Sequence, residues 1–315
     1  MAIIVNTNLS ALKTQDNLNN ASTNLTKSLE RLSTGLKINS AKDDAAGMFV
    51  ATGLSSQIRG SQVAKGNIAT GNNVLNMVEG DFDVIMENLN RIRDLAVQAS
   101  NSVFDTASLK SMKDEVELRL KEIDRIATAS NFNGMQLLCG TAGTPGTLST
   151  NGLRLQVGAG SNAAANSIVV DAKIFAQVSS TLLGSSSVAN DSGAIGIVPA
   201  TGSGITDGSL SANVPTAFGS SSAAAAFITV VDNAINTIAA RKAKIGTTMS
   251  RLESADISLQ TVIENNTAAK STIMDADIAA ESANYTKHQI LQQTSATLLI
   301  QANALPSLAL SLLAG

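Results

Sequence analysis

Apolar residues recur every seven positions over long stretches of the chain. One such series is Leu75, Phe82 and Leu89, and a second series, Val78, Ile85 and Ile92, lies three residues further on. Together they give the alternating spacing of three and four residues that is typical of a coiled-coil seam. Two further heptad series consist of Leu109, Val116 and Ile123, and of Val231, Ile238, Ile245, Leu252 and Leu259. The pattern predicts three packed helices at about 44–100, 106–129 and 225–270, the first roughly 85 Å long.

Both ends of the chain carry leucine stripes of the same kind. Near the start these are Leu18, Leu25 and Leu32, with Leu29 and Leu36 offset by four residues, and near the end Leu291, Leu298, Leu305 and Leu312. We expect two amphipathic terminal helices that pair with each other. A lone pair of such helices would leave much apolar surface in water, so we infer that other copies of the same chain bury it.

A marked joint separates each terminal stripe from the neighbouring long helix. Gly35 suits the position just after the end of a helix, and Ser40 with Asp43 resembles a capping box that starts the next helix. Asp43 and Asp44 would lie in its first turn, where negative charge is favoured. Asp275 and Asp277 form the matching joint before the last helix.

The centre of the chain differs in composition from both ends and is rich in Ser, Gly, Ala and Thr. Segments 153–158 and 166–171 predict the two strands of a β-hairpin, and a loop-like insertion follows. The expected fold is therefore mainly α: a long antiparallel coiled-coil or helical-bundle rod from both chain ends, with a small β-hairpin and a short irregular or β central insertion. The expected domains are 1–40 with 276–315, 41–176 with 227–275 (hairpin at 153–171), and the insertion at 177–226.

Composition narrows the class of protein. Hydrophobic residues make up 44 % of the chain but aromatic residues only 3 %, which suits long helices better than a bulky globular core. The net charge of −3 argues against a nucleic-acid partner. The N-terminus has no basic region followed by an apolar run, so no cleavable secretory signal is expected. The uncharged segment 289–315 is long enough to span a bilayer, but Gln, Asn and Pro interrupt it, and we expect a partner-binding helix instead.

Candidate chemistry is sparse. His288 is the single histidine, expected in solvent or at an interface, and Cys139 is the single cysteine, expected as a small buried apolar side chain. The segment 157–163, VGAGSNA, imitates a dinucleotide fingerprint, but we expect a returning strand after it and no acid lies about twenty residues on. Asp275 and Asp277 lack the glycine and glutamate spacing of a calcium loop. We therefore predict no catalytic residue, no cofactor, no metal site and no enzymatic activity.

Several blocks resemble bacterial flagellins. They are IIVNTNLSALKTQDNL at 3–18, RLSTGLKINSAKDDAAG at 31–47, NRIRDLAVQASN at 90–101, EIDRIATASNFNGMQLL at 122–138 and the C-terminal segment 282–313. The resemblance covers about 1–140 and 228–315. It implies an extracellular structural subunit of the flagellar filament that is exported unfolded by the flagellar type III apparatus without a cleaved signal. The terminal helices would be disordered in the monomer and would form the inner tube on assembly.

The resemblance also implies partners. These are further copies of the chain, the cap and hook–filament junction proteins, and a cytoplasmic export chaperone at the C-terminal helix. Family members are also recognised by Toll-like receptor 5, through the positions that correspond to Arg91, Leu95 and Glu115. Cytosolic inflammasome sensors recognise C-terminal leucines that match Leu310, Leu312 and Leu313. In the family the outer-tube hairpin, here 153–171, takes part in switching between supercoil forms.

Two other interpretations stay open. A hook–filament junction protein of the same superfamily would share the terminal helices without propagating a filament. A membrane-tethered helical adhesin would use the apolar C-terminus as an anchor, although leucines spaced by seven favour a helix partner over lipid. A further alternative, an enzyme in the central insertion, is disfavoured because this segment contains few titratable residues.

Overall fold

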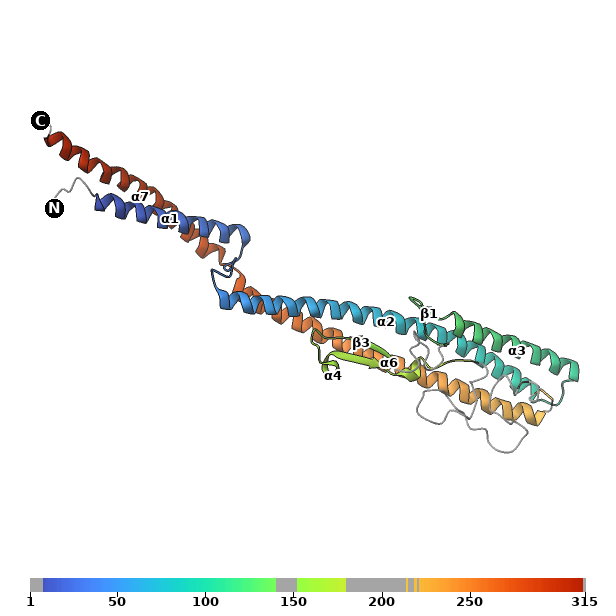
Figure 1. The fold of residues 1–315 in the computed structure, drawn as a ribbon. Coiled ribbons are helices and arrows are strands. Elements are labelled where there is room, and N and C mark those ends of the chain that lie inside the picture. The colour runs from blue at the N-terminus through green and yellow to red at the C-terminus, as the bar shows by residue number, and fades with distance from the viewer. Residues whose placement is uncertain (1–7, 140–151, 180–213, 215–217, 220, 314–315) are drawn as a thin grey trace. The chain divides into compact units, whose positions relative to one another are not determined.

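The structure is a computed structural model that describes residues 8–139, 152–179, 214, 218–219 and 221–313. Helices dominate the described chain (Figure 1). The long ones are α1 (Leu9–Thr34), α2 (Ala45–Ala99), α3 (Thr106–Ala129), α6 (Ser221–Met274) and α7 (Ile278–Leu313). The expected mainly helical class is confirmed, and the helices expected at 44–100 and 106–129 agree with α2 and α3 within one residue.

The chain packs as two compact units. The first combines Met1–Ile58 with Ile263–Gly315, and the second is Arg59–Val262. Helices α2 and α6 therefore each contribute residues to both units. The domain boundaries expected at 40/41 and 275/276 coincide with breaks between helices and stay a prediction.

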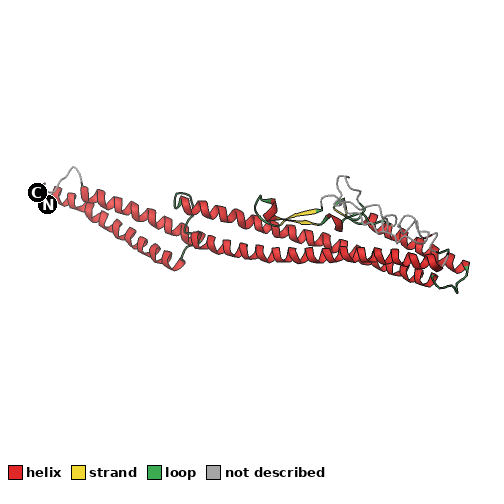
Figure 2. Cartoon of the chain, turned by 90° about the horizontal axis from the view of Figure 1, so that it is seen from below, coloured by secondary structure: helices red, strands yellow, loops and turns green. Residues whose placement is uncertain are grey.

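Heptad apolar residues form the core of the second unit. Phe82, Ile85 and Leu89 on α2 and Ile238 and Ile245 on α6 are completely buried. Val116 and Ile123 bring α3 into the same cluster. The interleaved spacing of three and four residues keeps one face of each helix toward its neighbours, so these heptads form the core that the sequence predicts. Figures 1 and 2 show α2, α3 and α6 lying side by side in this unit.

Ion pairs at the helix surfaces accompany this core. Arg93 Nε donates to Asp232 Oδ1 at 2.5 Å and joins α2 to α6. Arg119 Nη1 donates to Asn88 Oδ1 at 3.2 Å and joins α3 to α2. Lys242 and Asp83 form a further pair between α6 and α2. Asn88 is buried, but the two ion pairs are partly exposed, and pairs of this kind contribute little to stability.

The predicted β-hairpin is present on the same unit (Figure 2). Strand β3 (Leu153–Gln156) pairs antiparallel with β4 (Ser167–Val170), with Leu153 opposite Val170. Its loop holds the one-turn helix α4 (Ala163–Asn166), where the sequence predicts a direct return to a strand. Helix α4 begins because the Asn162 side chain accepts a hydrogen bond from the Ala164 N–H at 3.0 Å.

A second, very short hairpin was not predicted. Strands β1 (Asn131–Phe132) and β2 (Met135–Gln136) pair antiparallel around Asn133 and Gly134, which both have positive φ. Asn-Gly is the strongest short signal for such a two-residue turn, so the sequence carried the information. Phe132 packs on the core, and the segment that follows buries Leu137 and Leu138.

Arg241 on α6 is a buried cation in the second unit. Its Nη1 donates to the carbonyl of Ala176 at 2.6 Å, and its guanidinium lies 6.0 Å from the centre of the Phe82 ring. Burial lowers the pKa of Arg241 to about 10, so it stays charged at neutral pH. The contact attaches the segment after the 3-10 helix η1 (Ala172–Ile174) to the core.

The expected insertion at 177–226 lies mostly outside the described residues. Its last part differs from the expectation, because α6 begins at Ser221. The alanines at 223–226 favour a helix, and Ala224 and Phe227 are buried in the core.

Candidate assembly interface

Helices α1 and α7 pack antiparallel along their length, as expected of the terminal helices (Figure 1). Asn8 Nδ2 donates to the Ala302 carbonyl at 2.8 Å, and Arg31 lies 3.6 Å from Glu281 toward the other end of the pair. Positions of low exposure recur every three or four residues on both helices, which marks the shared seam. On α1 they are Ala11, Thr14, Leu18, Ala21, Leu25, Ser28 and Leu32, and on α7 Glu281, Tyr285, His288, Gln292, Ser295, Leu299 and Ala302.

The seam is therefore largely small and polar, and the α7 leucine stripe lies elsewhere. Leu291 and Leu298 are 42 % and 51 % exposed, although a stripe spaced by seven usually marks the seam of a pair. On α1, Leu18, Leu25 and Leu32 are partly buried but Leu29 is half exposed, and Leu36 belongs to the joint. The helical backbone of α7 includes Leu305 and Leu312, whose side chains lie outside the described residues.

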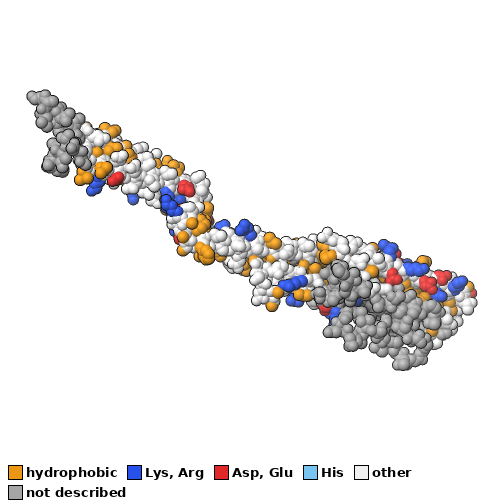
Figure 3. All heavy atoms as spheres, in the orientation of Figure 1, with side chains coloured by type: hydrophobic (Ala, Val, Ile, Leu, Met, Phe, Trp, Pro, Cys, Tyr) orange, Lys and Arg blue, Asp and Glu red, His pale blue; other side chains and the backbone are white. Residues whose placement is uncertain are grey.

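Other large apolar side chains add to this exposed surface. Figure 3 shows hydrophobic side chains gathered over the described part of the terminal helices. They include Leu9, Leu12, Ile278, Ile290 and Ile300. So many exposed large apolar side chains on one helix pair favour an interaction site, so the exposed leucines of α1 and α7 are the candidate self-assembly residues.

The first joint begins with Gly35. Gly35 ends α1 with a φ of 71°, a left-handed conformation that glycine adopts without a steric penalty, and its N–H bonds to the Arg31 carbonyl. The following residues pair with the end of α6: the Lys37 N–H donates to the Met274 carbonyl at 2.6 Å, and the Ala276 N–H donates to the Gly35 carbonyl at 2.9 Å. The two joints are therefore one structural element, which sequence spacing alone did not reveal.

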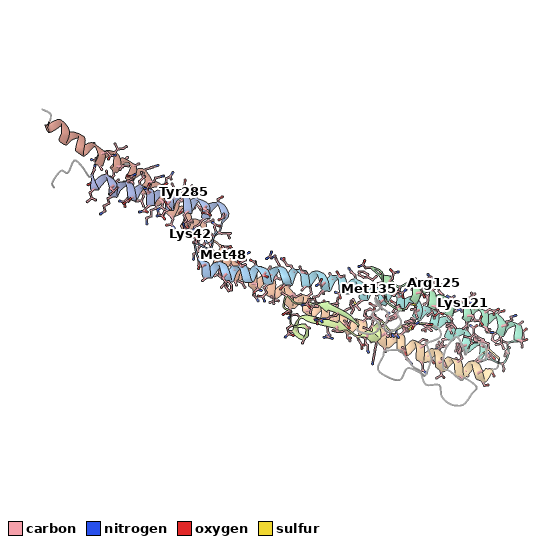
Figure 4. All side chains as sticks on the ribbon, viewed as in Figure 1. Lys42, Met48, Lys121, Arg125, Met135 and Tyr285 are labelled. Carbon is pink, nitrogen blue, oxygen red and sulfur yellow. The ribbon has the colours of Figure 1, made fainter. Side chains whose placement is uncertain are left out.

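A small apolar cluster holds this element together. Ile38, Ala51 and Met274 are buried, and Leu36 and Met48 pack on them. Figure 4 labels Met48 at the start of α2. The cluster explains why Leu36, although spaced like the α1 stripe, serves the joint.

The capping box predicted at the start of α2 needs a correction. The Asp43 carboxylate accepts from both the N–H and the hydroxyl of Ser40, but these residues form a turn ahead of the helix. Helix α2 begins at Ala45, and Asp44 caps it by accepting from the Gly47 N–H at 3.0 Å. Asp43 and Asp44 therefore precede the first turn. Asp43 instead pairs with Lys27 at 2.8 Å, and this ammonium holds the pKa of Asp43 well below its usual range.

The second joint has a simpler arrangement. Asp277 caps α7, because its Oδ1 accepts from the N–H groups of Ala279 and Ala280 at 2.9 and 3.2 Å. Asp275 accepts from the Ser271 hydroxyl at 2.5 Å, and its backbone forms a β-bridge with Leu36. Asp277 is therefore the cap of α7, whereas the Asp275 carboxylate contacts the end of α6 and caps no helix among the described residues.

The residues implied by the receptor resemblance divide into two groups. Arg91 on α2 and Glu115 on α3 form a two-point ion pair at the surface, with N–O distances of 2.8 and 3.2 Å. The Arg91 guanidinium lowers the pKa of the Glu115 carboxyl. Leu95 is 2 % exposed and belongs to the core, because it lies on the buried face of α2 with Ile92 and Ala96. Leu310, Leu312 and Leu313 lie in α7 with side chains outside the described residues.

The remaining candidate residues, His288, Cys139 and segment 157–163, form no catalytic or metal-binding group with the described residues. His288 lies in the α1–α7 seam, and its Nδ1 is buried without a hydrogen-bond partner among the described residues. Cys139 is partly exposed, not buried as expected, and lies 3.7 Å from Thr128 Oγ1. The glycines of segment 157–163 leave room for Asn166, whose carbonyl accepts from the Val157 N–H. Among the described residues, no group of three His, Cys, Asp or Glu side chains suits a metal ion.

Helix α6 is the described helix that is long and apolar enough to cross a membrane, with a mean hydropathy of 1.4 over its most apolar window. Length and composition alone are weak evidence, since the core helix of a soluble protein passes the same test. Phe227, Val231 and Ile238 of α6 are buried in the core of the second unit, which explains its apolar character.

Comparison with known proteins identifies the family. Residues 5–143 match the model for the bacterial flagellin N-terminal helical region, and residues 228–313 match the bacterial flagellin C-terminal helical region. The chain is 35 % identical to the flagellin of Bacillus subtilis over 98 % of this chain and 99 % of that one. It is 42 % identical to the phase 1 flagellin of Salmonella naestved, over 50 % of this chain and 30 % of that one.

A solved structure shares the fold. A putative flagellar hook-associated protein from Vibrio parahaemolyticus aligns with a TM-score of 0.50 and 14 % identity, covering 74 % of this chain and all of that one. At this identity the likeness concerns the fold alone. The two family models and the near full-length relative carry the assignment: the chain belongs to the bacterial flagellin family, whose members are the structural subunits of the extracellular flagellar filament.

Proposed function

We propose that this filament subunit polymerises by burying the exposed apolar faces of α1 and α7 against further copies of the chain. The observation that carries the proposal is the exposure of Leu29, Leu291 and Leu298 on helices that already pair through another, more polar seam. Because the pair leaves these leucines in water, only an additional partner can bury them. The stripe continues through Leu305 and Leu312, and its burial in the filament stabilises the α1–α7 pair.

For the route to the filament we propose the one that the flagellin resemblance implies. The chain leaves the cell unfolded through the flagellar type III apparatus, without a cleaved signal. A cytoplasmic chaperone covers the apolar C-terminal helix before export, and the subunit adds at the distal end beneath a cap protein, beyond the hook–filament junction proteins. The α1–α7 seam supports this route, because small and polar side chains interrupt its leucines and a pair held in this way opens more readily than a continuous apolar seam.

Seeded polymerisation tests the proposal. The purified chain is depolymerised by heat or acid, returned to neutral pH with short filament seeds, and imaged by electron microscopy. We expect long filaments that grow from the seeds. Seeds that stay unextended would instead favour a junction protein, which shares the terminal helices but does not propagate.

Deletion of 1–40 or of 276–315 provides the matched comparison. Each truncation removes one partner of the α1–α7 pair and should leave a monomer that cannot extend seeds. Filaments from either truncation would contradict the role of the terminal helices. The core of the second unit lies in 59–262, so its helical circular dichroism should survive both deletions.

We also propose that monomers are recognised by Toll-like receptor 5 through Arg91 and Glu115, which are partly exposed, with Leu95 holding α2 in place from within the core. Inflammasome sensors would read Leu310, Leu312 and Leu313. Arg91→Ala should reduce receptor signalling by monomers, while Lys121→Ala, a change on the outer face of α3, serves as a control. Equal signalling by wild type and Arg91→Ala would remove the receptor proposal.

A further inference from the structure

The joint, the single element formed by residues 35–51 and 271–277, is held by an apolar cluster that is partly built from methionine. The buried members are Ile38, Ala51 and Met274, and Leu36, Met48 and Ile273 pack on them. Because the cluster is so small, each of its side chains contributes a large share of its packing. A thioether sulfur is oxidised far more readily than a leucine or isoleucine side chain, so these two methionines decide how the joint responds to an oxidant.

The cluster has little room for an additional atom. A Cβ placed on Gly47, in the first turn of α2, would lie 2.7 Å from Ile38 Cδ1, so Ile38 packs directly against the helix backbone. Met274 is 8 % exposed, and its carbonyl accepts from the Lys37 N–H at 2.6 Å, which holds the end of α6 against the segment that follows α1. An oxygen added to either sulfur would therefore displace neighbouring side chains or turn the methionine out into water.

The backbone donors beside the two methionines are already engaged. The Met48 N–H donates to the Asp44 carbonyl at 3.0 Å, and the Asp275 N–H donates to the Ser271 carbonyl at 2.8 Å. The oxygen of a methionine sulfoxide is a polar acceptor, and a buried acceptor that finds no donor is destabilising. Oxidation would therefore place an unsatisfied polar atom inside the cluster that holds the joint together.

Both methionines can be reached from solvent. Met48 is only partly buried and lies at the start of α2 (Figure 4). Met274 is more protected, but a cluster with three buried members needs only a small opening to uncover it. Met77 offers a contrast, because it is 42 % exposed on α2 and belongs to neither apolar cluster. Oxidation of Met77 should therefore be faster and should leave the packing unchanged.

We propose that Met48 and Met274 are sites of reversible oxidation by a peroxide, and that their sulfoxides open the joint. One oxygen atom of hydrogen peroxide bonds to the thioether sulfur, the O–O bond breaks, and the second oxygen leaves as water. The sulfur loses the two electrons that the peroxide gains, and methionine sulfoxide reductases with a thiol reductant reverse the change. The filament is extracellular, so its subunits lie outside the reducing cytosol.

An open joint also affects the terminal helices, because α1 ends and α7 begins there. The Ala276 N–H donates to the Gly35 carbonyl at 2.9 Å, and the pair of Arg31 and Glu281 lies close by in the sequence. Loss of these contacts releases one end of the α1–α7 pair, so oxidised subunits should add to a filament more slowly. This consequence rests on the proposed polymerisation, whereas the opening of the joint itself does not.

Hydrogen exchange of the oxidised monomer tests the proposal. Wild type and Met48→Leu/Met274→Leu are treated with hydrogen peroxide, the oxidised residues are identified by mass spectrometry, and amide exchange is measured at Lys37 and Ala276. Leucine conserves the volume of methionine and has no sulfur to oxidise. We expect oxidation to speed exchange at these two amides about tenfold or more in wild type and to leave it unchanged in the double variant. Reduction by methionine sulfoxide reductases should restore slow exchange in wild type.

Met77→Leu is the matched control and should respond to peroxide as wild type does. The double variant keeps every other methionine, so an effect of those residues would appear in it as well. If the double variant lacks helical circular dichroism before treatment, the single variants Met48→Leu and Met274→Leu provide the comparison. Three results would overturn the proposal: joint methionines that stay unoxidised after Met77 is fully converted, wild-type exchange that oxidation leaves unchanged, or a double variant as sensitive as wild type.

Seeded elongation then tests the consequence for assembly. Oxidised wild type should extend seeds more slowly than the oxidised double variant, and equal rates would overturn the effect of the joint on the terminal helices. Failure of untreated wild type to extend seeds would instead refute the proposed polymerisation and would leave the exchange result in force.

Discussion

Removal of two exposed leucines separates assembly from folding most directly. In Leu291→Ala/Leu298→Ala both changes lie on the outward stripe of α7, and alanine is the best helix former. The helix should therefore keep its backbone and its seam with α1. Any loss of assembly can then be attributed to the apolar surface that these two leucines expose in the monomer.

The magnitude follows from the exposed fractions of the two side chains. Leu291 and Leu298 are 42 % and 51 % exposed, which together amounts to about one leucine side chain left in water. The change to alanine removes about three methylene-sized groups from each leucine, and each group contributes ~0.8 kcal/mol when fully buried. If the filament buries this surface, each subunit loses ~2 kcal/mol of assembly free energy.

The critical concentration for polymerisation is the quantity to measure. A loss of ~2 kcal/mol corresponds to a roughly 30-fold rise, because each 1.4 kcal/mol changes an equilibrium constant tenfold. Sedimentation of seeded reactions over a concentration series gives the value for wild type and for the double variant. The thermal unfolding of the monomer should not change, since neither leucine contributes to a described core cluster.

A critical concentration within twofold of wild type would refute the reasoning. The filament would then leave the α7 stripe exposed, and α1 and α7 would contribute to assembly only through the pair itself. A large fall in monomer stability would be equally damaging, because it would place the two leucines inside the fold.

Three further predictions concern the fold itself. Phe82→Ala should lower the free energy of unfolding by ~3–5 kcal/mol in chemical denaturation, because the Phe82 side chain of α2 is completely buried in the core of the second unit. Gly152→Ala should loosen the β3–β4 hairpin and speed its limited proteolysis, because Gly152 has a φ of 68° and an added Cβ would collide with the Val170 carbonyl. Asp43→Asn should speed hydrogen exchange of the joint at pH 7, because it removes the ion pair with Lys27 that lowers the pKa of Asp43. The difference between the variant and wild type should shrink as the pH falls below about 4, because protonation of Asp43 then removes the same ion pair from wild type.

Each of these changes has a matched control. Phe49 is 82 % exposed, so Phe49→Ala should leave the stability unchanged. Gly66 has open space at its Cβ within a helix, so Gly66→Ala should not loosen the hairpin. Asp16→Asn removes an exposed carboxylate on α1 and should not affect the joint. A control that behaves like its partner variant would show that the stated contact is not the cause.

Local periodicity determined most of the helical architecture. The heptads through Phe82 and Ile245 mark a buried face whatever the partner is, because a residue every seven positions stays on one side of a helix. Gly35 and Asp277 were equally readable, since a left-handed helix end and an N-cap need only their own neighbours. The flagellin blocks added the family, and with it the expectation of a polymer.

Tertiary structure decided which residues of the periodic stripes are buried. The antiparallel register of α1 and α7 brings Ala21 and Ser28 opposite α7 and turns Leu291 and Leu298 outward, a choice that the heptad alone does not make. Pairing of Leu36 with Asp275 joins segments more than two hundred residues apart. The burial of Arg241 likewise depends on contacts between elements distant in sequence, because burial is a property of surfaces that meet only after folding.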